Sequence, residues 1–428
     1  MDNDRLTDLG SSGGGGYDAA LLDHWPAGRT PGGDVRPRRG SPRSLVPRSL
    51  VPRSLRPIVK PLPAGRFRVH GSNAELRWEV MRGQGYVVPN ADFFVRNHTS
   101  TPLIDARSWS LSVFGTGLQG SVPAGRPVRF SYQDLLDLPT RTVVCAIECA
   151  GNGRSFFAAQ QGQAVPGTPW RLGAIGVAAW RGVPLSVVLE RAGITGVAVD
   201  VMPSGLDPDL VTAGVNYGRV RRPIPVAKAL DDVILAYEMN GEPLPPDHGF
   251  PVRVIVPHWA GIASIKWVGQ IEVSATPLVS YWNTQAYRLF GPAYPSDGTF
   301  ITTQPVRSAF ELEWDARLPA NQEYLLTGRS WSGSGPIART QISTDGGRRW
   351  HPAIPRDPGT PAAWQRWEFR WRTPDPGSYT LQARAIDVTG AIQPATVPGN
   401  TFGYHFGGIV EHPVITVQGA GRSGRSPC

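Results

Sequence analysis

The stretch Val143-Val-Cys-Ala-Ile-Glu-Cys-Ala-Gly-Asn-Gly-Arg-Ser-Phe-Phe157 joins an apolar run to a turn of small residues and then to an arginine. Its valines and isoleucine favour a buried strand, and residues 150–153 suit a turn whose backbone can approach a ligand closely. Cys149 is expected at the exit of that strand. Arg154 brings a planar, permanently charged group that favours an oxyanion and a nearby thiolate. The stretch therefore predicts a thiolate beside an anion pocket.

Two cysteines lie in this stretch, and only one is a candidate for a site. An isolated cysteine in a strand is usually a small core side chain, and we interpret Cys145 in this way. Cys149 lies four residues later with the same strand parity, but the turn that follows it should lift it to the rim of the sheet. The prediction is a buried Cys145 and an accessible Cys149.

The loop Cys149-Ala-Gly-Asn-Gly-Arg154 resembles the cysteine loop of the sulfite oxidase family of molybdenum enzymes. Other stretches resemble the same family in the same order, over about Pro57 to Val417. They are Phe94-Val-Arg-Asn-His98, Pro169-Trp-Arg-Leu-Gly-Ala174, Asp247-His-Gly-Phe-Pro-Val-Arg253, Ile265-Lys-Trp267 and Tyr281-Trp-Asn-Thr-Gln-Ala-Tyr-Arg288.

Composition narrows the class of protein. The chain has 428 residues, of which 40% are hydrophobic, which is enough for two packed domains. Its net charge of +9 comes from scattered arginines without a nucleic-acid-binding module, so we expect no nucleic-acid partner. No apolar run approaches the ~20 residues of a membrane span. Three cysteines and no clear signal peptide favour a cytoplasmic location, with a periplasmic or exported one left open.

The pattern along the chain predicts an α+β catalytic domain followed by an all-β, immunoglobulin-like sandwich. Residues 143–147 and 109–114 read as strands, and residues 132–138 and 184–192 as helices. We expect four sandwich strands, at residues 325–331, 338–343, 364–371 and 378–386. The predicted boundaries are a disordered low-complexity leader at 1–56, a molybdopterin-binding catalytic domain at 57–280, a connector at 281–305, the sandwich at 306–420 and a tail at 421–428. The resemblance implies that the sandwich is a dimerisation domain and the protein a homodimer.

The resemblance also implies a molybdenum–molybdopterin cofactor, with Cys149 as the protein ligand of the metal, because molybdenum takes a thiolate beside the pterin's sulfur atoms. The cofactor's phosphate requires charged and polar donors. The implied cofactor-binding residues are Phe94, Val95, Arg96, Asn97, His98, Cys149, Asp207, His248, Arg253, Ser264, Ile265 and Lys266. Judged from residue type alone, His248 and Arg253 would instead belong to a solvated or salt-bridged loop, and Lys266 would be a charge at the end of a strand.

For catalysis the resemblance implies Arg96 and Arg154 in an anion pocket, Trp170 as an aromatic wall and Tyr287 as a hydrogen-bond donor near the metal. A third arginine of the family's pocket comes from the C-terminal domain, and residues 400–408 contain none. His258 stands where many members supply a backbone contact to the cofactor, so we expect its imidazole to replace that contact.

The implied reaction is two-electron oxygen-atom transfer, most simply the oxidation of sulfite to sulfate. The chain has no fused haem segment, so the electrons are expected to pass to a separate acceptor such as a cytochrome. The missing arginine keeps a second hypothesis open, in which the substrate is a sulfane or a sulfoxide. A third is a non-catalytic dimeric sandwich protein without metal.

Overall fold

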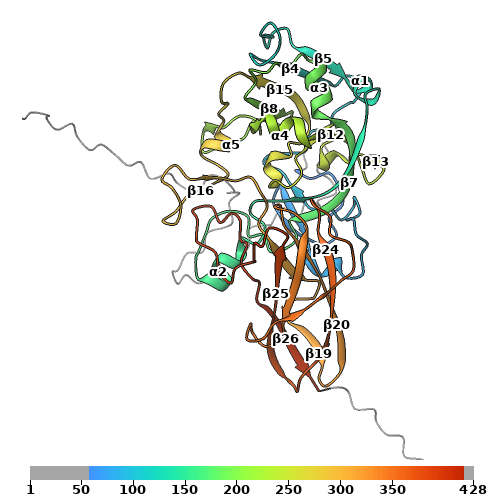
Figure 1. Ribbon diagram of the computed structural model, residues 1–428, viewed down its shortest axis with the longest axis vertical. Helices are drawn as coiled ribbons and strands as arrows, with labels where there is room; N and C mark the ends of the chain where they lie inside the picture. Colours follow the sequence, from blue (N-terminus) through green and yellow to red (C-terminus); the bar gives the residue numbers. More distant parts are fainter. Residues whose placement is uncertain (1–56, 419–428) are drawn as a thin grey trace, which may run out of the picture.

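The structure, a computed structural model, describes residues 57–418, so the predicted leader and tail lie outside the described residues. The molecule is elongated, with an α+β part at one end and an all-β sandwich at the other (Figure 1). This confirms the predicted fold class.

Two five-stranded sheets form most of the α+β part. The first has the order β11-β8-β15-β4-β5 and consists of β4 (Ser110–Phe114), β5 (Val128–Ser131), β8 (Asp200–Gly205), β11 (Ile224–Pro225) and β15 (Val268–Ser274). The second has the order β13-β12-β7-β6, with β14 paired to β12, and consists of β6 (Arg141–Glu148), β7 (Ile175–Pro184), β12 (Ile234–Met239), β13 (Glu242–Pro243) and β14 (Arg253–Ile255). The predicted strand at 143–147 is therefore the middle of β6.

Short elements surround these sheets. Three strands form a small sheet, namely β1 (Phe67–His70), β2 (Asn73–Leu76) and β3 (Val95–Arg96). Two hairpins are β9 (Val211–Thr212) with β10 (Val215–Asn216), and β16 (Arg288–Leu289) with β17 (Thr299–Phe300). The α-helices are α1 (Tyr132–Leu136), α2 (Ser155–Gln161), α3 (Leu185–Arg191), α4 (Val226–Asp231) and α5 (Tyr281–Thr284). The 3₁₀ turns are η4 (Trp78–Met81), η5 (Pro246–His248) and η6 (Gly261–Ala263).

Both helices expected from the sequence are present. In α1, Ser131 and Asp134 form a reciprocal capping box, which satisfies backbone N–H groups at the start of the helix. In α3, the side chains of Leu185, Val188 and Leu189 are buried, which is the apolar face that the spacing predicted.

The sandwich consists of two sheets. One has the order β18-β20-β24-β23, with β18 (Arg307–Phe310), β20 (Glu323–Trp331), β23 (Ile354–Pro355) and β24 (Gln365–Arg372). The other has the order β19-β26-β25-β21-β22, with β19 (Ala316–Pro319), β21 (Ile337–Ser343), β22 (His351–Pro352), β25 (Gly377–Asp387) and β26 (His412–Val417). All four strands expected here form, as β20, β21, β24 and β25.

The sandwich and the α+β part share a hydrophobic core. Trp331, Trp364 and Phe406 belong to the same cluster as Trp180 and Trp78. The Trp78 ring lies 5.9 Å from the Trp331 ring and 6.3 Å from the Trp364 ring, measured between centroids. This contact fixes the sandwich against the back of β6 and therefore against the cysteine loop that follows it.

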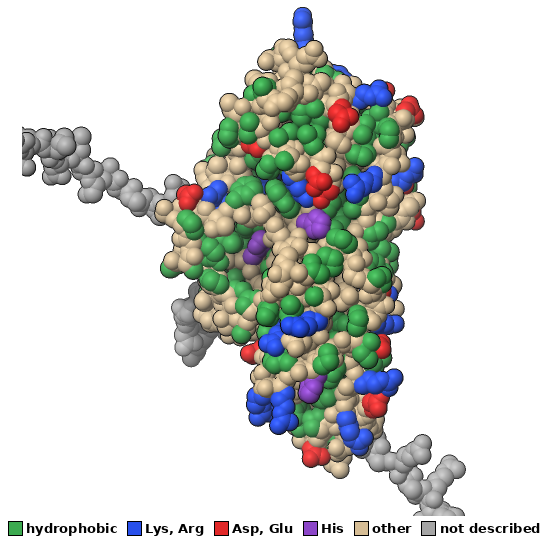
Figure 2. Space-filling view, in the orientation of Figure 1, with side chains coloured by type: hydrophobic (Ala, Val, Ile, Leu, Met, Phe, Trp, Pro, Cys, Tyr) green, Lys and Arg blue, Asp and Glu red, His purple; other side chains and the backbone are tan. Residues whose placement is uncertain are grey.

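The surface carries charges of both signs. On the face shown in Figure 2, the lysine and arginine side chains are interspersed with acidic ones, in keeping with the scattered arginines of the sequence. Within residues 57–418, no helix has the length and apolar character needed to cross a bilayer.

Candidate active site

The cysteine loop begins where β6 ends. Cys145 is completely buried within the strand, whereas Cys149 follows its last residue and is partly exposed, as predicted. The Cys149 N–H donates to the Ala174 carbonyl at 2.9 Å, and the Cys149 carbonyl accepts from the Asn152 N–H at 2.9 Å. Gly153 has φ +87°, a conformation that a residue with a Cβ seldom adopts, and it turns the chain toward α2.

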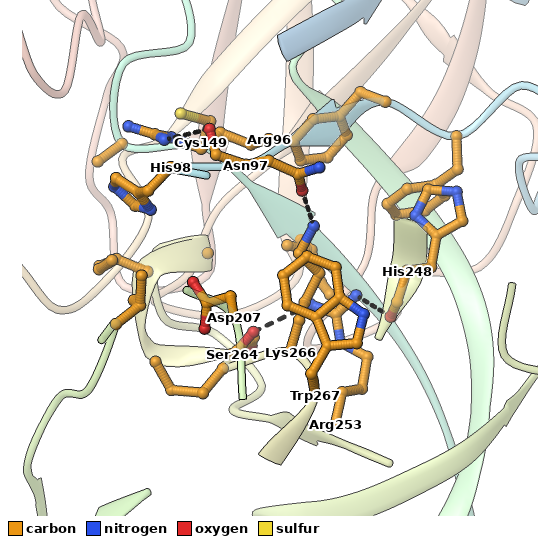
Figure 3. A pocket seen from close by; sticks show the side chains of 18 of the residues that line it. Arg96, Asn97, His98, Cys149, Asp207, His248, Arg253, Ser264, Lys266 and Trp267 are labelled. Carbon is orange, nitrogen blue, oxygen red and sulfur yellow. Dashed lines mark hydrogen bonds between the residues drawn. The ribbon is translucent and has the colours of Figure 1, made fainter. Parts of the chain in front are cut away.

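Cys149 opens onto a cavity of about 720 Å³. Side chains from four separate parts of the chain line it: the β3 region, the cysteine loop, the segment 207–220 and the segment 248–287. Of the predicted site residues the lining includes Phe94, Arg96, Asn97, His98, Cys149, Asp207, His248, Arg253, Ser264, Ile265, Lys266 and Tyr287. Figure 3 shows Cys149 well apart from His248 and Arg253, so the cavity extends from the thiol to a cationic region.

Three basic side chains define this cationic region. The Lys266 ammonium donates to the Asp247 carbonyl at 2.8 Å and to the Asn97 side chain, and burial lowers its pKa to about 7. Burial also lowers the pKa of Arg253 to about 9 and that of His248 well below its usual value. Among the described residues, neither His248 Nε2 nor Arg253 Nε has a hydrogen-bond partner. The unmet donors and buried charges suit an anionic ligand group.

Near the thiol, a histidine and a tyrosine form a hydrogen-bonded pair. His98 Nε2 lies 2.9 Å from the Tyr287 hydroxyl. Burial, together with Arg96 and Lys266, lowers the pKa of His98 well below its usual value, so the imidazole is neutral near pH 7. The Tyr287 ring stacks on Tyr404 from the C-terminal segment, with centroids 5.1 Å apart and planes 13° apart. A neutral imidazole can accept a hydrogen bond from the phenol or donate one to it, according to its tautomer.

The matches to known proteins agree with this geometry. The family model described as "Oxidoreductase molybdopterin binding domain" matches residues 98–282, and "Mo-co oxidoreductase dimerisation domain" matches residues 300–405. Mitochondrial sulfite oxidase of Mus musculus is 35% identical over 342 residues, which cover 76% of this chain and 60% of that protein. Sulfite oxidase of Arabidopsis thaliana is 32% identical over 336 residues, which cover 73% of this chain and 83% of that protein. The chain belongs to the sulfite oxidase family.

A solved structure supports the assignment to the sulfite oxidase family. The sulfane dehydrogenase SoxCD from Paracoccus pantotrophus matches with a TM-score of 0.69 and 26% identity, over 86% of this chain and 96% of that one. The chain itself spans only about 60% of the length of the mouse sulfite oxidase.

The cavity fits a molybdopterin cofactor, the group that gives the matched family domain its name. Cys149 offers one soft sulfur donor, as a metal that is already held by the sulfur atoms of a pterin requires. Within residues 57–418, no group of three or more His, Cys, Asp or Glu side chains is suited to holding a metal. Lys266, with the unpartnered nitrogens of His248 and Arg253, would hold the phosphate.

Three of the predicted site residues do not line the cavity: Val95, Arg154 and Trp170. Arg154 is buried behind the cysteine loop, where Nε donates to the Phe402 carbonyl at 2.9 Å and Nη1 donates to the Thr168 carbonyl at 3.0 Å. A Cβ on Gly151 would come within 2.7 Å of the guanidinium, so a larger residue there would displace the Arg154 side chain. Arg154 therefore connects the loop to the C-terminal segment.

Val95, Trp170 and His258 also lie outside the cavity and contact other parts of the protein instead. Val95 is buried in β3, and Trp170 is 1% exposed, with its ring edge-to-face against His70 at 5.6 Å. The expectation that His258 replaces a backbone contact to the cofactor is wrong. Its Nδ1 bonds to the Gly333 carbonyl of the sandwich at 3.1 Å, and it does not line the cavity.

Sequence reasoning missed several buried charges around this site. Glu148 precedes the cysteine ligand candidate and pairs with Arg307 of the sandwich at 2.7 Å. Arg222 is completely buried beside the Tyr287 loop. For Glu148 a signal existed, because a carboxylate inside an apolar strand needs a partner. The local sequence around Arg222 gives no indication that this side chain is buried.

Proposed function

We propose that this chain is a molybdenum–molybdopterin oxidoreductase that oxidises sulfite to sulfate and passes the electrons to a separate acceptor. The observation that carries the proposal is the single cavity that unites the Cys149 thiol, the Arg96 guanidinium and the Tyr287–His98 pair with a distant cationic region. In this arrangement Cys149 is the metal ligand. Phe94, Asn97, Asp207, Ser264 and Ile265 complete the binding surface, with Lys266, His248 and Arg253 at the phosphate.

When bound, the cofactor supplies two-electron redox and oxygen-atom-transfer chemistry. The overall change is that sulfite and water give sulfate, two protons and two electrons. The electrons pass to the acceptor, for which a cytochrome is our first choice.

The chain's own residues bind the anion and orient a hydrogen-bond donor toward it. Arg96 Nη1 donates to the Asn97 carbonyl at 2.9 Å, which fixes the guanidinium at the cavity wall, where it can hold an oxyanion. The Tyr287 hydroxyl can donate to a substrate oxygen. Through an Nε2–H, the neutral His98 can donate to the Tyr287 hydroxyl oxygen, which leaves the phenol proton available to that substrate oxygen.

A second candidate keeps the cofactor and changes the substrate to a sulfane. Two observations favour it: the match to a sulfane dehydrogenase, and the lack of an arginine in residues 400–408. A pocket with fewer fixed cations favours a less charged sulfur compound over a compact dianion.

Metal analysis and steady-state kinetics test these alternatives. The purified protein should contain molybdenum and a pterin, and should reduce ferricyanide or cytochrome c with sulfite. A higher kcat/KM with thiosulfate or a persulfide than with sulfite would favour a sulfane as the substrate. A folded protein that lacks molybdenum after expression with an intact cofactor supply would contradict both and leave a non-catalytic module.

We also propose that the protein is a homodimer through the sandwich. The support is the match of residues 300–405 to the dimerisation domain of this family. Sedimentation equilibrium should give twice the chain mass of 46.3 kDa. A monomer at micromolar concentration would contradict this assembly.

A further inference from the structure

Arg222 is a buried cation that the proposed mechanism does not use. It lies after the β9–β10 hairpin and just before β11, and it is 0% exposed. Its guanidinium donates to the Trp282 carbonyl of α5 and, at 2.6 Å, to the Ile301 carbonyl after β17. Within residues 57–418, Arg222 Nε has no hydrogen-bond partner.

Unlike the buried Arg307 and Arg329, Arg222 has no acid beside it. Arg307 pairs with Glu148 at 2.7 Å, and Arg329 pairs with Glu311 at 2.5 Å. Within the described chain, no carboxylate lies within ion-pair distance of Arg222. A buried charge without a counter-charge is costly, so its retention calls for an explanation.

The charge lies directly behind the wall of the active-site cavity. The Arg222 Cζ is 4.1 Å from the centre of the Phe300 ring and 6.0 Å from the centre of the Tyr287 ring. Tyr287 lines the cavity and stacks on Tyr404, whereas Arg222 itself does not line it. Burial lowers the pKa of Arg222 to about 9, which leaves it charged at neutral pH.

The same side chain holds the loop that carries Tyr287. Trp282 lies before Tyr287 and Ile301 after it, so the two hydrogen bonds of Arg222 bracket the tyrosine. Tyr287 has φ +55°, a conformation unfavourable for a residue with a side chain, which the surroundings must impose. Arg222 thus acts on Tyr287 by position and by charge.

We propose that Arg222 is a positioning residue whose buried charge, acting through Tyr287, favours an anionic substrate in a pocket to which residues 400–408 contribute no arginine. Its counter-charge is then the substrate itself, which approaches Tyr287 from the cavity side. This inference rests on the proposed function, because it assumes an anionic sulfur substrate.

A purely structural role must be separated from an electrostatic one, and two substitutions do so. Arg222→Met removes the charge and both hydrogen bonds, whereas Arg222→Lys keeps a charge but loses the planar fork. A buried lysine titrates more readily than an arginine, so the lysine variant should lose its charge as pH rises. If the charge matters, the affinity for anions should fall as pH rises in the lysine variant alone. Loss of a structural support would not produce this pH dependence.

The experiment uses the cofactor-loaded protein and sulfate as a probe, because sulfate stays a dianion across the neutral and alkaline range. Calorimetry gives the sulfate Kd, and steady-state assays with sulfite give KM and kcat. We expect Arg222→Met to raise both Kd and KM about tenfold with a smaller change in kcat. Arg221→Met is the matched control, because it removes the exposed charge of the neighbouring residue, and it should leave both values unchanged.

Arg222→Lys should resemble the wild type near pH 7 and bind sulfate more weakly as pH rises. The inference is overturned if the methionine variant binds sulfate as tightly as the wild type. It is equally overturned if the lysine and methionine variants are impaired alike at every pH, which would leave only a structural role. Wild-type protein that oxidises neither sulfite nor thiosulfate would refute the proposed function instead, and the sulfate titrations would still decide the role of Arg222.

Discussion

At the scale of single residues, position along β6 separates two identical side chains. Cys145 is completely buried, and burial raises the pKa of its thiol to about 12, so it does not form a thiolate at neutral pH. Cys149 is four residues further along, past the end of the strand, and it faces the cavity. The same chemical group is therefore inert at one position and available to a metal at the other.

Cys149→Ser should abolish turnover and lower the molybdenum content, because a hydroxyl is a poor donor for a soft metal site. Cys145→Ser should keep its metal and most of its activity, with a small loss of stability from burying a hydroxyl. Metal analysis, sulfite assays and melting curves of both variants check this. A metal-free but folded Cys145→Ser protein would reverse the assignment.

Arg154→Lys tests the residue that ties the cysteine loop to the C-terminal segment. Lysine cannot reproduce the two directed hydrogen bonds to the Phe402 and Thr168 carbonyls. The free energy of unfolding should fall by about 1–3 kcal/mol, the scale of hydrogen bonds to a charged group. Displacement of the loop should also raise the KM for sulfite. Unchanged denaturation midpoints would show that these contacts contribute nothing to stability.

The sequence alone could predict that Cys149 leaves its strand at a turn, but not which side chains surround the thiol. An apolar run that ends in a small-residue turn sufficed for Cys149, because strand exit and turn are local properties. The stacking of Tyr404 on Tyr287 and the position of Arg154 behind the loop depend on segments over one hundred residues apart in the chain. Only the packed structure brings these segments together.

At the scale of secondary-structure elements, a buried ion pair joins β6 to the sandwich. Glu148 ends β6 and accepts from Arg307 of β18 at 2.7 Å, from Trp331 of β20 at 3.0 Å and from Asn152 of the loop at 2.8 Å. Arg307 also donates to the Asn152 carbonyl at 3.0 Å. The sandwich thus helps set the conformation of the loop that carries Cys149.

Arg307→Met should destabilise the protein by about 3–5 kcal/mol, because it leaves the Glu148 carboxylate buried without a counter-charge. The double variant with Glu148→Gln should recover part of that loss, since no unpaired charge then remains. Urea denaturation of the two single variants and the double variant measures the coupling. Additive effects would mean that the pair is not coupled.

At the scale of the whole molecule, the sandwich completes the hydrophobic core of the α+β part. Trp331, Trp364 and Phe406 come from the C-terminal region and pack in one cluster with Trp78 and Trp180. The predicted boundaries at 280 and 305 follow the change from mixed to all-β patterning, which the sequence reveals well. The shared core could not be predicted. The sequence pattern around each tryptophan is the same whether the two regions form separate cores or one common core.

The charge buried in the cavity should make the stability of the cofactor-free protein depend on pH. Burial lowers the pKa of Lys266 to about 7 from 10.5, so the folded chain releases this proton at a lower pH than the unfolded chain. Between those two values the unfolded state binds more protons, and stability rises with pH; below about pH 7 the destabilisation is fully present. In the cofactor-free protein, Lys266→Met should abolish a rise of about 3 kcal/mol between roughly pH 6 and pH 9.5. Bound cofactor should flatten the rise in the wild type, because a phosphate supplies the missing counter-charge. Urea titrations of the cofactor-free and loaded wild type and of the cofactor-free variant measure these slopes. A variant as steep as the wild type would contradict the role of Lys266, whereas a flat variant with equal slopes in the free and loaded wild type would place the phosphate away from Lys266.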